Sequence, residues 1–281
     1  MTLHPAIAPG RVAVITGGAS GIGLAAARRF AGHGMKVVIA DVVGLDEARG
    51  ELETGGAPVL ALRTDVSQLD QVRDLARRAG ELGQVSILMN NAGVGVGGGA
   101  IENPEGWRRV IETNLFGVIN GMQAFGQAMI DGGIPAAIVN TGSKQGITTP
   151  PGDTAYNVSK AGIKVATEGL AHTLRNIAGC QVTAHLLVPG FTFTGMTRRR
   201  VAEKPPGAWT PEQVVDFMIA RMSGGDFYII CPDNEVTREI DNARMTWAMQ
   251  DITRNRPPLS RWHPDYAHAF AEFLAEETGV G

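Results

Sequence analysis

The chain has 281 residues, of which 44% are hydrophobic and 19% are charged, a composition typical of a globular protein with one substantial core. A net charge of −3 without a long basic run provides no electrostatic basis for binding nucleic acid, and no apolar run approaches the ~20 residues that span a membrane. Two cysteines outside any Cys-x-x-Cys pair suit a reducing compartment, so we expect a cytoplasmic protein. The six histidines lack zinc-site spacing, and we expect no metal.

Short β-rich runs alternate with helical patterns along the chain. We expect strands at residues 12–16, 36–40, 59–62, 87–90, 137–140, 182–188 and 227–230. This alternation predicts an α/β protein: a doubly wound Rossmann fold with a seven-stranded parallel sheet and helices on both faces. Right-handed crossovers bring the carboxyl ends of the strands to one edge, where such folds bind their ligands.

The C-terminal third contains an irregular connection and several helical segments. Thr210, Pro211 and Gln213 have the pattern of a helix N-terminus, so the preceding connection, residues 189–210, is long enough to form a lid. Residues 234–252 and 267–277 have helical spacing. We expect one oxidoreductase domain over 1–281, with a core at about 10–232 and a helical extension at about 233–281.

A glycine-rich turn follows the first expected strand. Gly17, Gly21 and Gly23 would let backbone amides approach a pyrophosphate at the start of an Ala-rich helix. Asp41 ends the second strand, where a carboxylate can accept hydrogen bonds from ribose hydroxyls and repels a 2′-phosphate. This pattern favours NAD as the cofactor over NADP.

Tyr156 and Lys160 are four residues apart, so on a helix they share one face, and Ser143 follows an expected strand. An ammonium about 4 Å from the phenol, at an effective dielectric constant of about 20, would contribute roughly 4 kcal/mol toward the phenolate. That lowers the tyrosine pKa from about 10 toward neutral, as acid/base work on an alcohol requires. For the pair alone, a buried tyrosine beside a snorkelling lysine is the commoner explanation.

Several motifs in one order make the chemical interpretation the stronger one. They are Thr16-Gly17-x-x-x-Gly21-Ile22-Gly23, Asn90-Asn91-Ala92-Gly93, Asn114, Ser143, Tyr156-x-x-x-Lys160 and Pro189-Gly190 with Thr194. Over about residues 10–231 this set closely resembles the short-chain dehydrogenase/reductase family. The longer tail is similar to the branch that contains bacterial aryl-alcohol Cα-dehydrogenases.

The resemblance implies a role for each matching residue. Tyr156 would be the catalytic acid/base, Lys160 would bind the nicotinamide ribose and lower the tyrosine pKa, and Ser143 would hold the substrate oxygen. Asn114 would position a water in a proton relay. The cofactor would contact Gly17, Ser20, Gly21, Ile22, Gly23, Asp41, Val42, Asp65, Val66, Asn91, Ala92, Gly93, Thr141, Tyr156, Lys160, Pro189, Gly190, Thr192 and Thr194.

The substrate is expected to be an apolar, or aromatic, secondary alcohol or its ketone. Its pocket would be lined by Ser143 with Val94, Val96, Lys144, Gln145, Phe191, Phe193, Met196 and Trp209. The glycine-rich run 95–99 is interpreted as a flexible connection. Arg198, Arg199 and Arg200 are interpreted as solvated side chains rather than as an anion site.

The sequence also bears on subunit assembly and on two alternative functions. Residues 107–130 carry more apolar positions than one narrow stripe needs, and the equivalent helix of the family pairs across a twofold axis, which favours a homodimer or homotetramer. A cofactor-sensing regulator is disfavoured because the full catalytic set is present. A nucleotide-sugar epimerase or dehydratase is disfavoured because about fifty residues are too few for its usual C-terminal domain.

Overall fold

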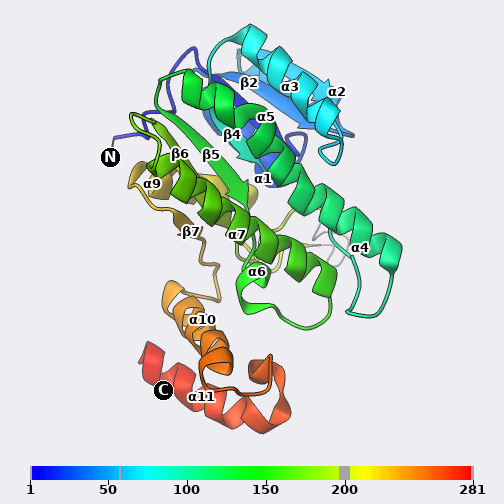
Figure 1. The fold of residues 1–281 in the computed structure, drawn as a ribbon, viewed down its shortest axis with the longest axis vertical. Coiled ribbons are helices and arrows are strands. Elements are labelled where there is room, and N and C mark those ends of the chain that lie inside the picture. The colour runs from blue at the N-terminus through cyan, green and yellow to red at the C-terminus, as the bar shows by residue number, and fades with distance from the viewer. Residues whose placement is uncertain (1, 57, 196–202, 280–281) are drawn as a thin grey trace.

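A computed structural model describes residues 2–56, 58–195 and 203–279, and its core is a seven-stranded, wholly parallel sheet (Figure 1). The order along the sheet is β3-β2-β1-β4-β5-β6-β7. The strands are β1 (Val12–Thr16), β2 (Lys36–Asp41), β3 (Val59–Arg63), β4 (Val85–Asn90), β5 (Ala136–Thr141), β6 (Val182–Val188) and β7 (Tyr228–Ile230). The seven predicted strands and the doubly wound fold are confirmed.

Helices cover the sheet on both faces. They are α1 (Gly21–Gly32), α2 (Leu45–Thr54), α3 (Leu69–Leu82), α4 (Pro104–Val110), α5 (Gly117–Asp131), α6 (Gln145–Thr148), α7 (Thr154–Arg175), α9 (Pro211–Ser223), α10 (Arg238–Thr253) and α11 (Ala267–Thr278). Apolar residues of α1, α2 and α9 pack on one face of the sheet, and those of α3, α5 and α7 pack on the other. The central strands are therefore buried on both sides, which is why they appear in the sequence as continuous apolar runs.

The strand order reverses its direction of growth between β1 and β4. From β1 the chain builds outward through β2 to β3, and it then returns to add β4 on the other side of β1. At such a switch point the loops after the two neighbouring strands diverge and leave a crevice at the carboxyl edge of the sheet. The glycine-rich turn after β1 and the Asn91 loop after β4 meet there.

The single helix expected over residues 107–130 is interrupted. The chain forms α4, then a π-helical turn η1 (Ile111–Phe116), then α5. Asn114, in the π-helical turn, is completely buried and bonds both to the backbone of the preceding loop and to α7. Widened turns of this kind are frequent at functional sites, and they are not marked by apolar periodicity.

Two helices form an arm that projects from one end of the sheet domain (Figure 1). Trp247 of α10 packs against Phe270 and Phe273 of α11, with ring centroids 5.3 and 5.2 Å apart, and the Arg256 guanidinium lies 3.9 Å from its ring. The expected helix over 267–277 is confirmed as α11. The helix expected from residue 234 begins instead at Arg238, because Thr237 caps it by accepting the Ile240 amide.

The described N-terminal residues are fastened to the sheet by a pair of buried histidines. Ala6 donates its amide to His4 Nδ1, which requires that nitrogen to be unprotonated, and the His4 ring lies edge-on to the ring of His185 in β6, with centroids 5.5 Å apart. His185 Nδ1 donates to the Asp226 carbonyl at 2.7 Å. Burial, and then the neighbouring His185, lower the pKa of His4 to about 4, and burial also lowers the pKa of His185.

This pair predicts a loss of stability in mild acid. Because the folded-state pKa of His4 lies below its unfolded value, the unfolded chain binds more protons between about pH 6.5 and about pH 4, so the stabilisation present above this window is lost through it. We expect the free energy of unfolding to fall from about pH 7.5 to about pH 4.5, and to fall less in His4→Gln. Urea unfolding at both pH values measures this. Equal falls in the two proteins would contradict the role of His4.

Candidate active site

Helix α7 presents Tyr156 and Lys160 on one face beside the end of β5. Lys160 is only 4% exposed; its Nζ donates to the Thr141 carbonyl at 2.8 Å and lies 5.6 Å from the centroid of the Tyr156 ring. Burial lowers the pKa of Lys160 to about 8, so the ammonium form still dominates at neutral pH. A cation is therefore held beside the phenol ring in a site largely closed to water.

Ser143 lies two residues after β5, at the start of the short helix α6. The Gln145 amide donates to Ser143 Oγ at 3.2 Å, and the Ser143 carbonyl accepts the Gly146 amide at 2.9 Å. The hydroxyl oxygen is thus anchored by the first turn of α6, with its proton free to donate elsewhere. The position of α6 consequently determines where the hydroxyl group points.

Asn114 joins the π-helical turn to two other parts of the site. Its Oδ1 accepts the Val94 amide at 2.7 Å, while its Nδ2 donates to the Val94 carbonyl at 2.9 Å and to Ser159 Oγ at 3.1 Å. A Cβ at Gly93 would lie 3.3 Å from Asn114 Oδ1 and 3.8 Å from Lys160 Nζ. The side chain therefore fixes the loop after β4 against Lys160.

The turn between β1 and α1 has the shape of a dinucleotide phosphate cradle. Gly17 has a φ of +63°, and a Cβ there would lie 2.8 Å from the Ala92 Cα. A Cβ at Gly23 would lie 2.1 Å from the Gly17 carbonyl oxygen. Only glycine fits at either position, and the backbone amides at the start of α1 are left open to an anion. These residues fit a nicotinamide dinucleotide.

Asp41 holds this turn at the end of β2. Its Oδ2 accepts the Ala19 amide at 3.1 Å, and its Oδ1 accepts the Val42 amide at 2.8 Å. A carboxylate oxygen has two lone pairs, so both oxygens can still accept a hydroxyl. The carboxylate is half-exposed at the mouth of the crevice, where the ribose of an adenosine moiety would lie.

The other expected cofactor residues after β3 and β4 are brought to the same edge. Asp65 Oδ1 accepts the Ser67 amide and hydroxyl, and Val66 packs against Gly117 at the start of α5. Asn91 Nδ2 donates to the Thr16 carbonyl at 3.2 Å, which links the loop after β4 to the glycine-rich turn. Thr194, in the connection after β6, lies beside the same glycine-rich turn, because a Cβ at Gly21 would lie 3.4 Å from its side chain.

Asp153 is a site residue that sequence reasoning missed. It caps α7 by accepting the Tyr156 amide, and its two oxygens also accept the amides of Val96, Gly97 and Gly98. The run 95–99 is therefore not a flexible connection, as interpreted from its glycines, but is hydrogen-bonded to the N-terminus of α7. An aspartate three residues before the tyrosine is the capping pattern that signals this position.

Several of the expected pocket residues contact other parts of the chain. Trp209 packs edge-on against Phe217 of α9 with ring centroids 5.7 Å apart, and Lys144 Nζ lies 2.6 Å from Asp241 Oδ2 in the C-terminal arm. Phe191 and Val96 are 41% and 62% exposed, and Gln145 is half-buried in α6. Met196 and Arg198, Arg199 and Arg200 lie outside the described residues.

Among residues 2–56, 58–195 and 203–279, no group of three or more His, Cys, Asp or Glu side chains is placed to hold a metal ion. In the same described part of the chain, no helix has both the length and the apolar character needed to cross a bilayer.

A seven-stranded parallel sheet, a glycine cradle at its switch point and a tyrosine–lysine pair define a dinucleotide-dependent oxidoreductase. The family model for short chain dehydrogenases matches residues 11–205. A 1-deoxy-11-beta-hydroxypentalenate dehydrogenase from Streptomyces arenae is 33% identical over 262 residues, covering 90% of this chain and 93% of the relative. The chain belongs to the short-chain dehydrogenase/reductase family.

Two solved structures carry the same fold. A short-chain dehydrogenase/reductase from Burkholderia phymatum in complex with NAD has a TM-score of 0.81 and 35% identity, covering 92% of this chain and 98% of its own. A metagenomic short-chain oxidoreductase in complex with NADP has a TM-score of 0.67 and 28% identity, covering 80% and 98%. Members similar to this chain therefore bind either cofactor.

Proposed function

We propose that this protein is an NAD-dependent oxidoreductase that interconverts a secondary alcohol and a ketone, with Tyr156 as the acid/base. The observation that carries the proposal is the buried Lys160 ammonium, held by the Thr141 carbonyl next to the Tyr156 ring on the same helix face. A buried cation without a carboxylate partner among the described contacts is costly, and stabilising a neighbouring phenolate gives it a function.

Each residue of the proposed site has a chemical task. When bound, the oxidised nicotinamide accepts a hydride from the alcohol carbon, and the reduced form returns it. Tyr156 takes the hydroxyl proton in oxidation and donates it in reduction, while the Lys160 ammonium stabilises the phenolate. The Ser143 hydroxyl donates to the substrate oxygen and keeps it within reach of the phenol. Asn114 anchors Val94 beside them.

A preference for NAD is supported by the carboxylate of Asp41. Repulsion between a carboxylate and a phosphate about 5 Å apart, at an effective dielectric constant of about 20, amounts to roughly 3 kcal/mol. The Asp41 side chain is partly screened by water, so the discrimination it provides against NADP is smaller than this value.

Replacement of Asp41 by asparagine isolates the contribution of charge. Asp41→Asn keeps an oxygen that can accept the Ala19 amide, so the turn stays in place while the repulsion disappears. We expect the ratio of kcat/KM for NAD to that for NADP to fall by at least about tenfold. Steady-state kinetics with both cofactors measures it. An unchanged ratio would remove the argument for NAD.

The substrate class is proposed from the crevice walls and is tested by a screen. The exposed Phe191 and the neighbouring valines Val94 and Val96 favour an apolar or aromatic substrate. The wild-type protein should reduce NAD with at least one member of a panel of aliphatic, cyclic and aryl secondary alcohols. Tight NADH binding without turnover of any alcohol or ketone would instead favour a cofactor-sensing regulator.

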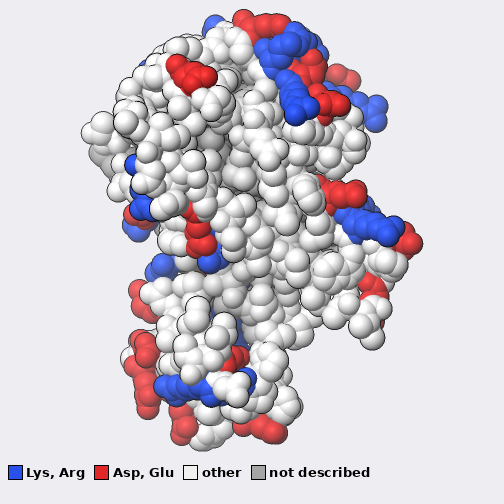
Figure 2. Space-filling view, in the orientation of Figure 1, with Lys and Arg blue, Asp and Glu red and all other residues white. Residues whose placement is uncertain are grey.

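We also propose that the chain assembles as a homodimer or homotetramer through α5 and α7. Phe116, Val158 and Val165 are 49%, 44% and 64% exposed on this side. Figure 2 shows charged side chains at the upper end, along both flanks and over the C-terminal arm, around a broad, mostly uncharged central surface. An uncharged apolar surface on a globular chain is typical of a subunit interface. Sedimentation equilibrium measures the assembly.

A further inference from the structure

Three charged side chains lie buried together where the C-terminal arm joins the sheet domain. Lys144 Nζ is 2.6 Å from Asp241 Oδ2 and 3.5 Å from Asp233 Oδ2. The two aspartate side chains are each 7% exposed and the lysine side chain is 18% exposed. Because a buried charge that loses its partner is strongly destabilising, these three groups hold one another in place.

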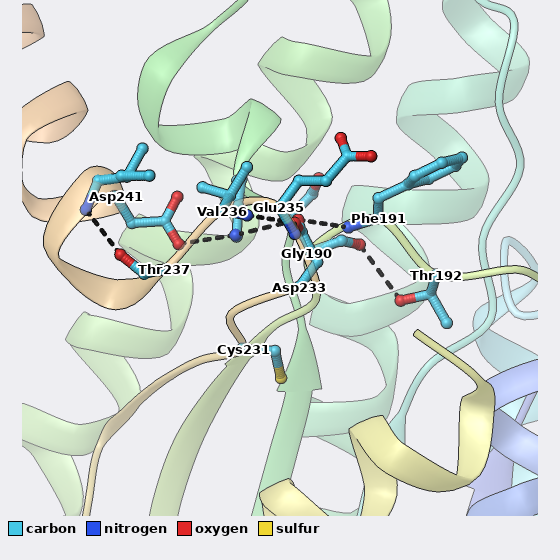
Figure 3. Close-up of polar contacts among 12 residues, drawn as sticks. Gly190, Phe191, Thr192, Cys231, Asp233, Glu235, Val236, Thr237 and Asp241 are labelled. Atoms are coloured by element: carbon cyan, nitrogen blue, oxygen red, sulfur yellow. Dashed lines mark hydrogen bonds and ion pairs between the residues drawn. The ribbon is translucent and has the colours of Figure 1, made fainter. Parts of the chain in front are cut away.

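Asp233 also binds the backbone at the start of the connection that follows β6 (Figure 3). Its Oδ2 accepts the Phe191 amide at 3.2 Å, and its Oδ1 accepts the Glu235 and Val236 amides at 3.1 and 2.7 Å. A Cβ at Gly190 would lie 2.9 Å from Asp233 Oδ2 and 3.1 Å from Lys144 Nζ. The charged cluster is therefore packed directly against the backbone at Gly190 and Phe191, just after β6.

The same turn of the arm holds the other end of that connection. Asn234 donates its amide to the Gly207 carbonyl at 3.1 Å and its Nδ2 to the Pro206 carbonyl at 2.6 Å. The Trp209 amide donates to the Phe191 carbonyl at 2.8 Å, so the two ends are also paired with each other. The described residues at both ends of this connection are thus fixed to the first residues of the C-terminal extension.

Lys144 connects this junction to the proposed catalytic serine. It directly follows Ser143, and its carbonyl accepts the Ile147 amide at 3.0 Å in the first turn of α6. That turn also supplies the Gln145 amide that anchors Ser143 Oγ. A shift of Lys144 therefore moves both the backbone and the hydroxyl of Ser143.

We propose that Asp233 and Asp241 of the C-terminal extension, acting through Lys144, position Ser143 and the backbone of residues 190–195 at the alcohol site. They are positioning residues: they act on the reacting groups through Lys144 and through the backbone at Gly190 and Phe191. The extension thereby determines the geometry of alcohol binding and leaves the nucleotide cradle at β1 and β2 untouched. This inference rests on the proposed function, since it assigns the junction to the substrate side of that site.

The test compares Asp241→Asn and Lys144→Met with Lys144→Arg and with a matched control. Asp241→Asn removes one charge at constant size, on a helix outside the proposed pocket. Lys144→Arg keeps the cation. Asp216→Asn is the control, because Asp216 pairs with Arg29 at 2.6 Å on the exposed side of α1 and α9. Each protein is measured for turnover with the alcohol found in the screen, for NADH affinity by fluorescence, and for amide hydrogen exchange.

We expect Asp241→Asn and Lys144→Met to lower kcat about tenfold to a hundredfold, the size of effect that misplaced reacting groups produce. Their NADH affinity should fall much less than kcat, by no more than about fivefold, because the glycine cradle stays in place and only the expected contacts at Gly190, Thr192 and Thr194 are loosened. Exchange should rise in residues 143–148, 190–195 and 203–209 and stay unchanged in α1. Lys144→Arg should recover most of the turnover, and Asp216→Asn should match wild type throughout.

Two results would overturn the inference. One is wild-type turnover and exchange in Asp241→Asn; the other is a loss spread evenly over α1, NADH binding and turnover, which would indicate general destabilisation. Hydrogen exchange needs no substrate, so the coupling of the arm to Ser143 and to residues 190–195 and 203–209 is decided even if no alcohol is turned over. Failure of the proposed function would appear separately, as absence of turnover in the wild-type protein.

Discussion

Tyr156→Phe should abolish most of the turnover while leaving the cofactor in place. The substitution removes only the phenolic hydroxyl and keeps the ring beside the Lys160 ammonium, 5.6 Å from its centroid. Because the hydroxyl is the proposed proton donor and acceptor, we expect kcat to fall by about 10²–10⁴, the usual size of a general acid/base contribution. Steady-state kinetics with the screened alcohol, together with NADH fluorescence titration, measures both quantities.

A second tyrosine provides the matched control for this experiment. Tyr228 lies on β7, 46% exposed, and its hydroxyl donates to Glu168 Oε1 at 2.5 Å, away from α1 and the loop after β4. Tyr228→Phe should therefore leave kcat unchanged. A Tyr156→Phe protein that turned over alcohol as fast as Tyr228→Phe would show that the proton passes through another group.

Gly23→Ala should disrupt the nucleotide cradle itself. The added methyl group would lie 2.1 Å from the Gly17 carbonyl oxygen and 2.8 Å from Asn91 Nδ2, so the first turn of α1 must move away from the end of β1. We expect the protein to lose about 1–3 kcal/mol of stability, as overpacked sites do. We expect NADH affinity to fall at least about tenfold, because the amides at the start of α1 no longer point at one place.

The control for this change lies in the same helix. Gly32 ends α1, and a Cβ there would have no neighbour within 4 Å. Gly32→Ala should leave NADH affinity unchanged and raise the free energy of unfolding by up to about 1 kcal/mol, because alanine loses less conformational freedom in a helix. Equal NADH affinity in the two alanine variants, measured by fluorescence titration, would contradict the cradle.

The parts of the fold that could be predicted are those set by local pattern. The seven strands are continuous apolar runs because both faces of the sheet are covered, and Thr210 with Gln213 forms the predicted capping box at the start of α9. Both signals are complete within a few residues of sequence. The motif order then led to the family, which the comparisons confirm.

The parts that could not be predicted depend on contacts between distant segments. Apolar spacing over 107–130 gave no sign of the π-helical turn, because that turn accommodates the buried bonds of Asn114 to Val94 and Ser159. The pairing of Lys144 with Asp241 required the position of α10, which no periodicity encodes. Both misses lie beside the proposed catalytic residues, where local sequence rules are most often overridden.

The central claim is a hydride transfer between a secondary alcohol and NAD at Tyr156, and isotope transfer tests it most directly. The wild-type protein is incubated with NAD and an alcohol from the screen that carries deuterium on the carbinol carbon, and the reduced cofactor is analysed by mass spectrometry. The account predicts one deuterium in each NADH formed and a slower rate than for the unlabelled alcohol. Tyr156→Phe should form labelled NADH only to the extent of its residual turnover. Cofactor that binds tightly but stays oxidised with every alcohol of the panel, or NADH formed without the label, would contradict it.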